Sequence, residues 1–171
     1  TKSRIILNQL ELPLPKKIFV HGYFTVNGQK MSKSLGNVIW PEDLAEKFGA
    51  DGSRYLLMSS LNYGQDSDIS WEKLTEKYNA DLANNLGNLV SRILKLNEKI
   101  KAKVGKEKPK IENLDRLYEE IELKEILDKI WEQISWVNKY IEEKKLWELV
   151  KNNPKEGKKV LSELLSLISE I

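Results

Sequence analysis

Apolar and polar positions change their spacing once along this chain of 171 residues, near Trp71. Before that point, apolar residues come in short runs between Gly, Pro and Asn, which is typical of short strands, short helices and turns. After it, apolar residues recur every three or four positions over long stretches, which is the spacing of amphipathic helices. The pattern predicts a mainly α fold, with a small α/β region followed by an antiparallel bundle of long helices.

The first part of the chain should contain one strand and one tight turn. Residues 1–17 have no clear assignment, because prolines interrupt their short apolar run. Residues 18–26 are rich in β-branched and aromatic side chains and predict a strand. The Asn-Gly pair at 27–28 is typical of a tight turn, so the chain should reverse its direction there.

Short helical segments are expected between residues 41 and 60. The segment 41–48 begins with Pro, Glu and Asp, which suit a first helical turn, and Gly49 follows as its expected end. A second short helix is expected over residues 53–60. Residues 62–70 are predicted to form a loop, with a brief strand around residues 68–69.

Three long helices are expected after residue 70. Their apolar stripes cover residues 71–100, 113–144 and 154–171, and stretches containing Gly or Pro at 105–109 and 152–154 separate them. The sequence ends inside an apolar helix without a polar tail. We therefore expect it to be a fragment of a longer chain.

Composition narrows the classes of chemistry. Hydrophobic residues make up 40% and charged residues 32% of the chain, which fits a soluble globular protein expected in the cytoplasm. Because the chain has no cysteine and a single histidine, we expect no disulfide, no thiol nucleophile and no zinc site. The net charge of +2 is too small for the whole chain to attract nucleic acid non-specifically. The lysines at 99–103 either contact phosphates or form a solvated helix end.

The main candidate for chemistry is a short loop between Gly28 and Gly36, which we call the clamp loop. Two ammonium groups three residues apart, with hydroxyl residues beside them, suit a triphosphate whose leaving group gains negative charge. The two glycines would let the loop close over a ligand and reopen. A loop rich in Lys and Ser is otherwise often a solvated turn. The clamp loop consists of Lys30, Met31, Ser32, Lys33 and Ser34.

The longer stretch from His21 to Asn37 closely resembles the second signature of class I aminoacyl-tRNA synthetases. The resemblance implies ATP, with Mg²⁺, as a substrate: an amino acid carboxylate attacks the α-phosphate and pyrophosphate leaves. It implies that Lys33 grips the triphosphate and Lys30 supports it, both as catalytic residues. The clamp loop would bind ATP together with His21, whose alternative role is that of a partly buried structural histidine.

A second candidate site follows one face of the predicted helix 71–100. Asn84, Asn88 and Arg92 are spaced by four residues and span about 80° of helix surface. An apolar set that includes Leu86 and Leu89 is centred roughly 120° away. One face can therefore pack while the other offers amide and guanidinium groups, which read the edges of unstacked bases. The plainer alternative is a solvated polar face.

The stretch from Tyr78 to Arg92 looks like the first anticodon-domain helix of the methionyl-tRNA synthetase family. The resemblance implies that Asn88 and Arg92, with Asn84 in the same row, contact the anticodon. It also implies that Trp147 stacks on an anticodon base, although Leu146 stands where the family usually has Pro. Gly87 would permit close approach of a helix or of RNA. Trp131 and Trp136 are expected to pack in the core.

The resemblance covers nearly the whole chain but only the later part of the family. It implies that residues 1–70 form the end of the catalytic domain, with the clamp loop and a stem-contact region, and that residues 71–171 form the anticodon-binding bundle. The first class I signature, the methionine pocket and the zinc-binding insertion would lie upstream. Methionine and ATP would then bind with the help of that upstream half.

Three functional hypotheses remain open. The chain is a fragment of a methionyl-tRNA synthetase acting on tRNA(Met), including initiator tRNA. Alternatively, it is a free-standing tRNA-binding module without catalysis, or part of another class I synthetase such as the cysteinyl enzyme. No membrane partner is expected, because no apolar run approaches the roughly 20 residues of a membrane helix.

Overall fold

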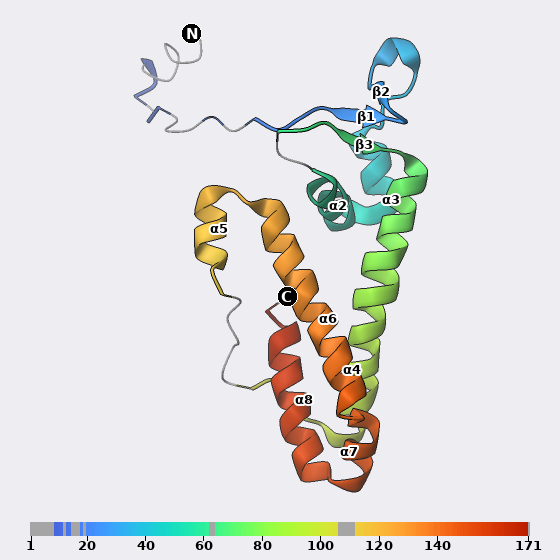
Figure 1. Ribbon diagram of the computed structural model, residues 1–171, viewed down its shortest axis with the longest axis vertical. Helices are drawn as coiled ribbons and strands as arrows, with labels where there is room; N and C mark the ends of the chain where they lie inside the picture. The colour runs from blue at the N-terminus through green and yellow to red at the C-terminus, as the bar shows by residue number, and fades with distance from the viewer. Residues whose placement is uncertain are drawn as a thin grey trace.

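The computed structural model describes residues 9–11, 13–14, 18, 20–61, 64–105 and 112–170. A small three-stranded sheet lies at one end of an elongated molecule, and a bundle of helices extends away from it (Figure 1). The helices form most of the molecule, and the sheet lies within a small α/β region. The predicted mainly α fold class is confirmed.

The sheet has the strand order β2-β1-β3. Strand β1 (Phe24–Val26) pairs antiparallel with β2 (Gln29–Lys30) and parallel with β3 (Ser67–Ile69). The turn between β1 and β2 is formed by Asn27 and Gly28, which have positive φ angles of 52° and 74°. The predicted Asn-Gly turn and the brief strand near residues 68–69 are therefore confirmed.

The strand predicted over residues 18–26 is wrong in its length. It begins only at Phe24, and the side chains of Ile18 and Val20 are 81% and 76% exposed. The parallel partner β3 is three residues long, so it offers no pairing further back. At Gly22 the chain instead crosses Gln65 so closely that an added Cβ would lie 1.9 Å from the Gln65 carbonyl oxygen.

Helix α2 (Pro41–Ser60) consists of two helical segments separated by a kink at Gly49. Gly49 has φ 73° and ψ 164°, a conformation that favours glycine. The predicted stop at Gly49 is confirmed, and so is a second helical segment after it, although that segment begins before Ser53. The Ser53 hydroxyl donates a hydrogen bond of 2.7 Å to the Gly49 carbonyl and steadies the kink.

The long helix predicted over residues 71–100 is confirmed, but its middle is wound differently. It consists of α3 (Trp71–Lys77), the π-helical segment η2 (Tyr78–Gly87) and α4 (Asn88–Ile100). A Cβ at Gly87 would lie 3.1 Å from the Leu82 carbonyl oxygen, five residues earlier in the same helix. Gly87 therefore suits the wide π turn of its own helix.

The helix predicted over residues 113–144 is wrong in its continuity. It divides into α5 (Leu114–Glu120) and α6 (Leu123–Glu143). Ile121 lies between them with φ 63°, and its amide donates to the Tyr118 carbonyl at 3.2 Å. A β-branched residue is rare in this left-handed conformation, so residue type alone gives no sign of the break.

Trp147 lies in a short helix that the apolar pattern did not predict. The chain turns at Lys145, which has φ 43°, and Trp147 lies in the next helix, α7 (Leu146–Asn152). The last predicted helix is confirmed as α8 (Pro154–Ile168). Asn153 caps it, because its side-chain oxygen accepts the Glu156 amide at 3.3 Å.

Two hydrophobic cores hold the molecule together. The sheet-end core contains Ile39, Leu44, Phe48, Leu56, Ile69 and Leu74. The bundle core joins α4, α6, α7 and α8 and contains Leu89, Ile93, Ala102, Ile134, Val137, Ile141, Leu146, Val150, Val160, Leu161, Leu164 and Leu167. In the described part of the chain, no helix is both long and apolar enough to cross a membrane.

Candidate functional site

The clamp loop forms a short helical turn rather than an open loop. Lys30 ends β2, and residues Lys33–Leu35 form the 3₁₀ helix η1. Ser32 caps this turn, because its hydroxyl accepts the Leu35 amide at 3.3 Å. The turn ends at Gly36, whose φ of 65° is the left-handed conformation that glycine adopts without strain.

Asn37 fastens the first half of the clamp loop. Its side-chain oxygen accepts the Ser32 amide at 2.8 Å, and its amide nitrogen donates to the Lys30 carbonyl at 3.2 Å. Met31 packs against the sheet-end core beside them. One side chain therefore holds the backbone on both sides of Met31, while the lysine side chains stay outside this network.

Both lysines of the clamp loop are exposed. The Lys33 Nζ lies 5.3 Å from the centre of the Trp40 ring, within the range of a cation–π contact. Among the described residues, neither Lys30 nor Lys33 forms an ion pair with an acidic side chain. Their charge is therefore available to an anionic ligand.

Asp68 fastens the turn that leads into the clamp loop. Its Oδ1 accepts the Thr25 hydroxyl at 2.8 Å and the Gly28 amide at 2.6 Å, and its Oδ2 accepts the Lys73 ammonium at 2.5 Å. These hydrogen bonds, with Lys73 contributing most, lower the pKa of Asp68 from 3.8 to about 2. The carboxylate thus joins β1, the β1–β2 turn and helix α3.

His21 is exposed and lies outside the hydrogen-bond network of the clamp loop. Its Nδ1 is 2.6 Å from the Gly22 carbonyl oxygen, and its ring centre is 6.3 Å from that of Phe24. The interpretation of His21 as a partly buried structural histidine is therefore wrong. It lies next to strand β1, with its ring accessible to solvent.

A polar pocket of about 470 Å³ lies between the π-helical segment, α4 and α6. The structure brings together the three residues that the spacing singled out, Asn84, Asn88 and Arg92. The wide π turn adds Asn85 to the same pocket, and α6 contributes Asn138. The remaining lining residues are Ser91 and Lys95.

Contacts from α6 order two of the groups in this pocket. The Asn138 amide donates to the Asn85 side-chain oxygen at 3.1 Å. The Arg92 guanidinium pairs with Glu142 at 2.5 Å, with 38% and 58% of the two side chains exposed. Amide oxygens and nitrogens therefore line one side of the pocket, next to an arginine that a single carboxylate orients.

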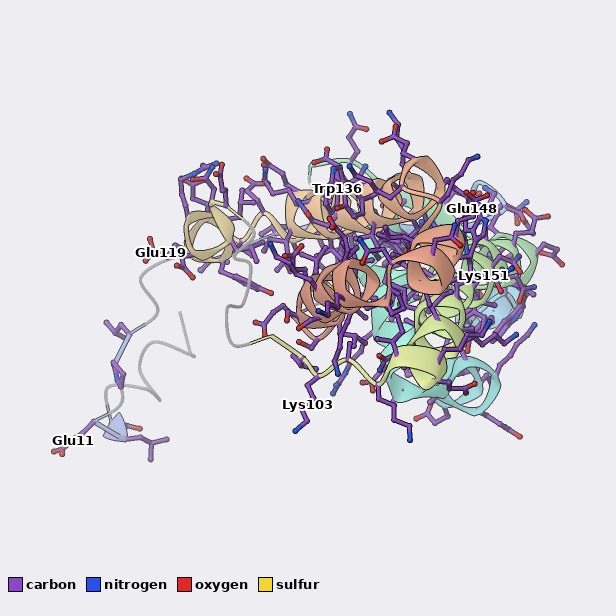
Figure 2. The ribbon with its side chains drawn as sticks, turned by 90° about the horizontal axis from the view of Figure 1, so that it is seen from below. Glu11, Lys103, Glu119, Trp136, Glu148 and Lys151 are labelled. Carbon is purple, nitrogen blue, oxygen red and sulfur yellow. The ribbon has the colours of Figure 1, made fainter. Side chains whose placement is uncertain are left out.

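The tryptophans of the bundle differ from expectation in one case. Trp147 lies in the first turn of α7 and is 43% exposed. Trp131 packs edge-on against Tyr55, with ring centres 5.8 Å apart. The core assignment of Trp136 is wrong, because it is 52% exposed and stacks on Tyr140 at 5.0 Å. Figure 2 shows Trp136 at the edge of the bundle, on α6.

The described residues contain no group of three His, Asp or Glu side chains that could hold a metal ion. The functional groups of the two sites are instead ammonium, guanidinium, hydroxyl and amide groups. Such groups bind phosphates and the edges of bases.

The family described as tRNA synthetases class I (M) matches residues 4–94 of this chain. This match includes the clamp loop and the row Asn84, Asn88 and Arg92. The chain belongs to this family. The matched segment therefore contains the clamp loop and the part of the polar pocket that Asn84, Asn88 and Arg92 form.

Relatives of the class I (M) synthetase chain were found in several bacteria. The methionine–tRNA ligase of Thermotoga maritima is 42% identical over 161 residues, which cover 85% of this chain and 26% of the relative. The methionine–tRNA ligase of Clostridium acetobutylicum is 41% identical over 169 residues, covering 90% and 26%. The chain thus spans about a quarter of the length of these relatives.

A solved structure has the same fold. The Mycobacterium tuberculosis methionyl-tRNA synthetase, in complex with methionyl-adenylate, superposes with a TM-score of 0.71 and 29% identity. The superposition covers 97% of this chain and 35% of that structure. The small sheet and the helical bundle are therefore arranged as in a class I (M) synthetase.

Several residues of the two sites were not found from the sequence. Asn138 and Glu142 belong to α6, about fifty positions from the residues that they contact. Asn37 and Asp68 act through hydrogen bonds to backbone groups, which periodicity does not reveal. The available sign for Asn37 was its place at the end of the resembling stretch.

Proposed function

We propose that this chain is part of a methionine–tRNA ligase, which makes methionyl-adenylate from methionine and ATP and transfers the methionyl group to tRNA(Met), including initiator tRNA. The observation that carries the proposal is the clamp loop, whose two lysines have no acidic partner among the described residues, on a chain of the class I (M) family. The names of the relatives and the bound methionyl-adenylate in the M. tuberculosis enzyme support it.

The clamp loop would act in the formation of methionyl-adenylate, where it would contact the pyrophosphate leaving group. A methionine carboxylate oxygen forms a bond to the α-phosphorus, and the bond from that phosphorus to the β-phosphate bridging oxygen breaks. The electron pair leaves with pyrophosphate, so negative charge grows where Lys33 and Lys30 can contact it. Mg²⁺ enters as part of the ATP substrate. The methionine pocket belongs to the part of the ligase that this chain does not span.

The polar pocket would read the anticodon. Single-stranded loops are recognised through unstacked bases, which amide and guanidinium groups contact at their edges. Asn84, Asn88 and Arg92 supply such groups, and the half-exposed ring of Trp147 offers a surface for stacking. In this proposal residues 1–70 serve ATP chemistry and the tRNA stem, while residues 71–171 serve the anticodon.

The test is ATP–pyrophosphate exchange by the full-length protein. We expect exchange that requires methionine and that falls about 10²–10³-fold in the Lys33→Ala variant, because one preorganised cationic contact to the developing charge is lost. Lys139→Ala is the control, since Lys139 is an exposed lysine of α6 that pairs with Glu143, one helical turn away, and lies outside both sites. Full exchange activity in Lys33→Ala would refute the catalytic role of the loop.

A tRNA-binding module without catalysis is the second candidate. It is favoured by one observation: the polar pocket lies in the bundle and shares no residue with the clamp loop. The two candidates differ in a single measurement. A full-length protein that binds tRNA(Met) but catalyses no methionine-dependent exchange would be such a module.

A further inference from the structure

Trp40 occupies a position that a helix normally gives to a small polar residue. It is the N-cap of α2, and its side chain makes no capping hydrogen bond. Ser, Thr, Asp and Asn are preferred there, because their oxygen accepts a free amide of the first turn. The indole is 44% exposed, so core packing does not account for it fully either.

The backbone holds Trp40 in a fixed place. Pro41 restricts the residue before it to extended conformations, and Trp40 has φ −81° and ψ 143°. Ile39 and Leu44, on either side, are buried in the sheet-end core. The indole is therefore attached to a rigid support, next to the clamp loop.

Lys33 approaches this ring from the clamp loop. Its Nζ lies 5.3 Å from the indole centre, and indole is the aromatic ring that binds cations best. The backbone around Lys33 is held by Asn37 and by the Ser32 cap, so the position of the ammonium depends mainly on the flexible lysine side chain.

We propose that Trp40 is a positioning residue that holds the Lys33 ammonium over its indole while no triphosphate is bound. This inference rests on the proposed function of the clamp loop. A cation–π contact at an exposed site is weak, whereas hydrogen bonds from an ammonium to phosphate oxygens are strengthened by both charges. The triphosphate therefore draws Lys33 away from Trp40, and the indole contact is a modest cost of ATP binding.

The Trp40→Leu variant of the full-length protein tests the proposal. Leu keeps an apolar side chain that cannot cap the helix, so the substitution removes the ring and little else. We expect the KM for ATP in pyrophosphate exchange to fall about two- to fivefold while kcat stays the same, because free Lys33 no longer has to leave the ring. The KM for ATP of Trp40→Phe should lie between those of the wild type and Trp40→Leu, because phenyl binds cations less well than indole.

A double-mutant cycle separates this role from a structural one. In the Lys33→Ala background, Trp40→Leu should leave the ATP affinity unchanged when it is measured by equilibrium binding. Trp136→Leu is the matched control, since Trp136 is also half-exposed but stacks on Tyr140 in α6. It should not change the KM for ATP.

Three results would overturn the inference: an unchanged KM for ATP in Trp40→Leu, a fall in kcat, or an equal shift of affinity with and without Lys33. These results can be distinguished from a failure of the proposed function by the Lys33→Ala variant. If Lys33→Ala loses exchange but Trp40→Leu does nothing, the clamp loop is catalytic and only the role of Trp40 is wrong. If Lys33→Ala keeps full exchange, the proposed function itself fails.

Discussion

At the scale of single residues, Asp68 connects three segments around the turn that leads into the clamp loop. One carboxylate accepts a hydroxyl, a backbone amide and an ammonium from three different elements. The Gly28 amide belongs to the turn from which β2 and the clamp loop follow. Loss of this carboxylate would therefore release the turn and leave the cationic groups less well placed.

The depressed pKa of Asp68 predicts a specific pH dependence. Because its folded pKa is about 2 and its ordinary value is 3.8, the carboxylate stabilises the fold above about pH 4, and this contribution is lost as pH falls towards 2. In Asp68→Asn, thermal unfolding should occur at lower temperature at neutral pH and should depend less on pH between about 4 and 2. Thermal unfolding followed by circular dichroism at each pH measures both effects.

Asp51→Asn is the control for this experiment. Asp51 is also an acid, but its side chain is 99% exposed and its pairing with Arg54 is long, at 3.6 Å. Exposed pairs of this kind contribute little to stability. If Asp68→Asn unfolds with the same pH profile as the wild type, the carboxylate does not fasten the turn.

At the scale of elements, α7 and α8 meet at a position that admits no side chain. A Cβ added to Gly157 would lie 2.9 Å from the Val150 Cα and 3.2 Å from its amide nitrogen. Both neighbours are backbone atoms, so the strain cannot be relieved by turning a side chain. Gly157 thus sets the distance between the helix that carries Trp147 and the helix that supports it.

We expect Gly157→Ala to lower the free energy of unfolding by about 1–3 kcal/mol, because overpacking moves α8 away from α7. This range is the net change, after the gain of up to roughly 1 kcal/mol that Ala brings over Gly in a helix. Urea denaturation of the full-length protein, followed by fluorescence, measures the change. Lys158→Ala, an exposed position of α8 beside it, should stay close to the wild type.

The sequence predicted the features that depend on spacing within one helix, and it missed those that depend on unusual backbone conformations. Asn84, Asn88 and Arg92 were found because they share one helix, where spacing determines the face. The break at Ile121 was missed, because this residue takes a left-handed conformation that its type disfavours. The short helix α7 was not predicted, although the end of the helix before it was placed correctly at residue 144. The π turns also have no local pattern, so periodicity predicted an ordinary helix.

At the scale of the whole molecule, one continuous helix connects the two cores. The segments α3, η2 and α4 run from the sheet down to α7 (Figure 1). At its middle, the Tyr55 hydroxyl donates to Asp81 at 2.5 Å, and Lys77 pairs with the same carboxylate at 2.9 Å. Burial, followed by Asp81, raises the pKa of the Tyr55 hydroxyl, so Tyr55 keeps the proton that it donates to Asp81.

Tyr55 also connects the continuous helix to α6. The Tyr55 ring, on α2, contacts Trp131 of α6 edge-on, so three elements meet around one tyrosine. The clamp loop and the polar pocket are thus attached to one packed framework rather than to separate parts joined by a flexible linker. The polar pocket is therefore held at a defined distance from the clamp loop.

The polar pocket and Trp147 give the last prediction, which tests the proposed reading of the anticodon in the full-length protein. Trp147→Ala should weaken binding to an RNA hairpin with a CAU anticodon about 5- to 150-fold, since base–aromatic stacking contributes roughly 1–3 kcal/mol. A hairpin with a GCA anticodon should bind weakly to both proteins. Fluorescence anisotropy at constant salt measures the four affinities, and Trp136→Ala, with a similarly exposed ring, is the control. Equal losses on both hairpins would mean that the ring binds RNA without reading the anticodon.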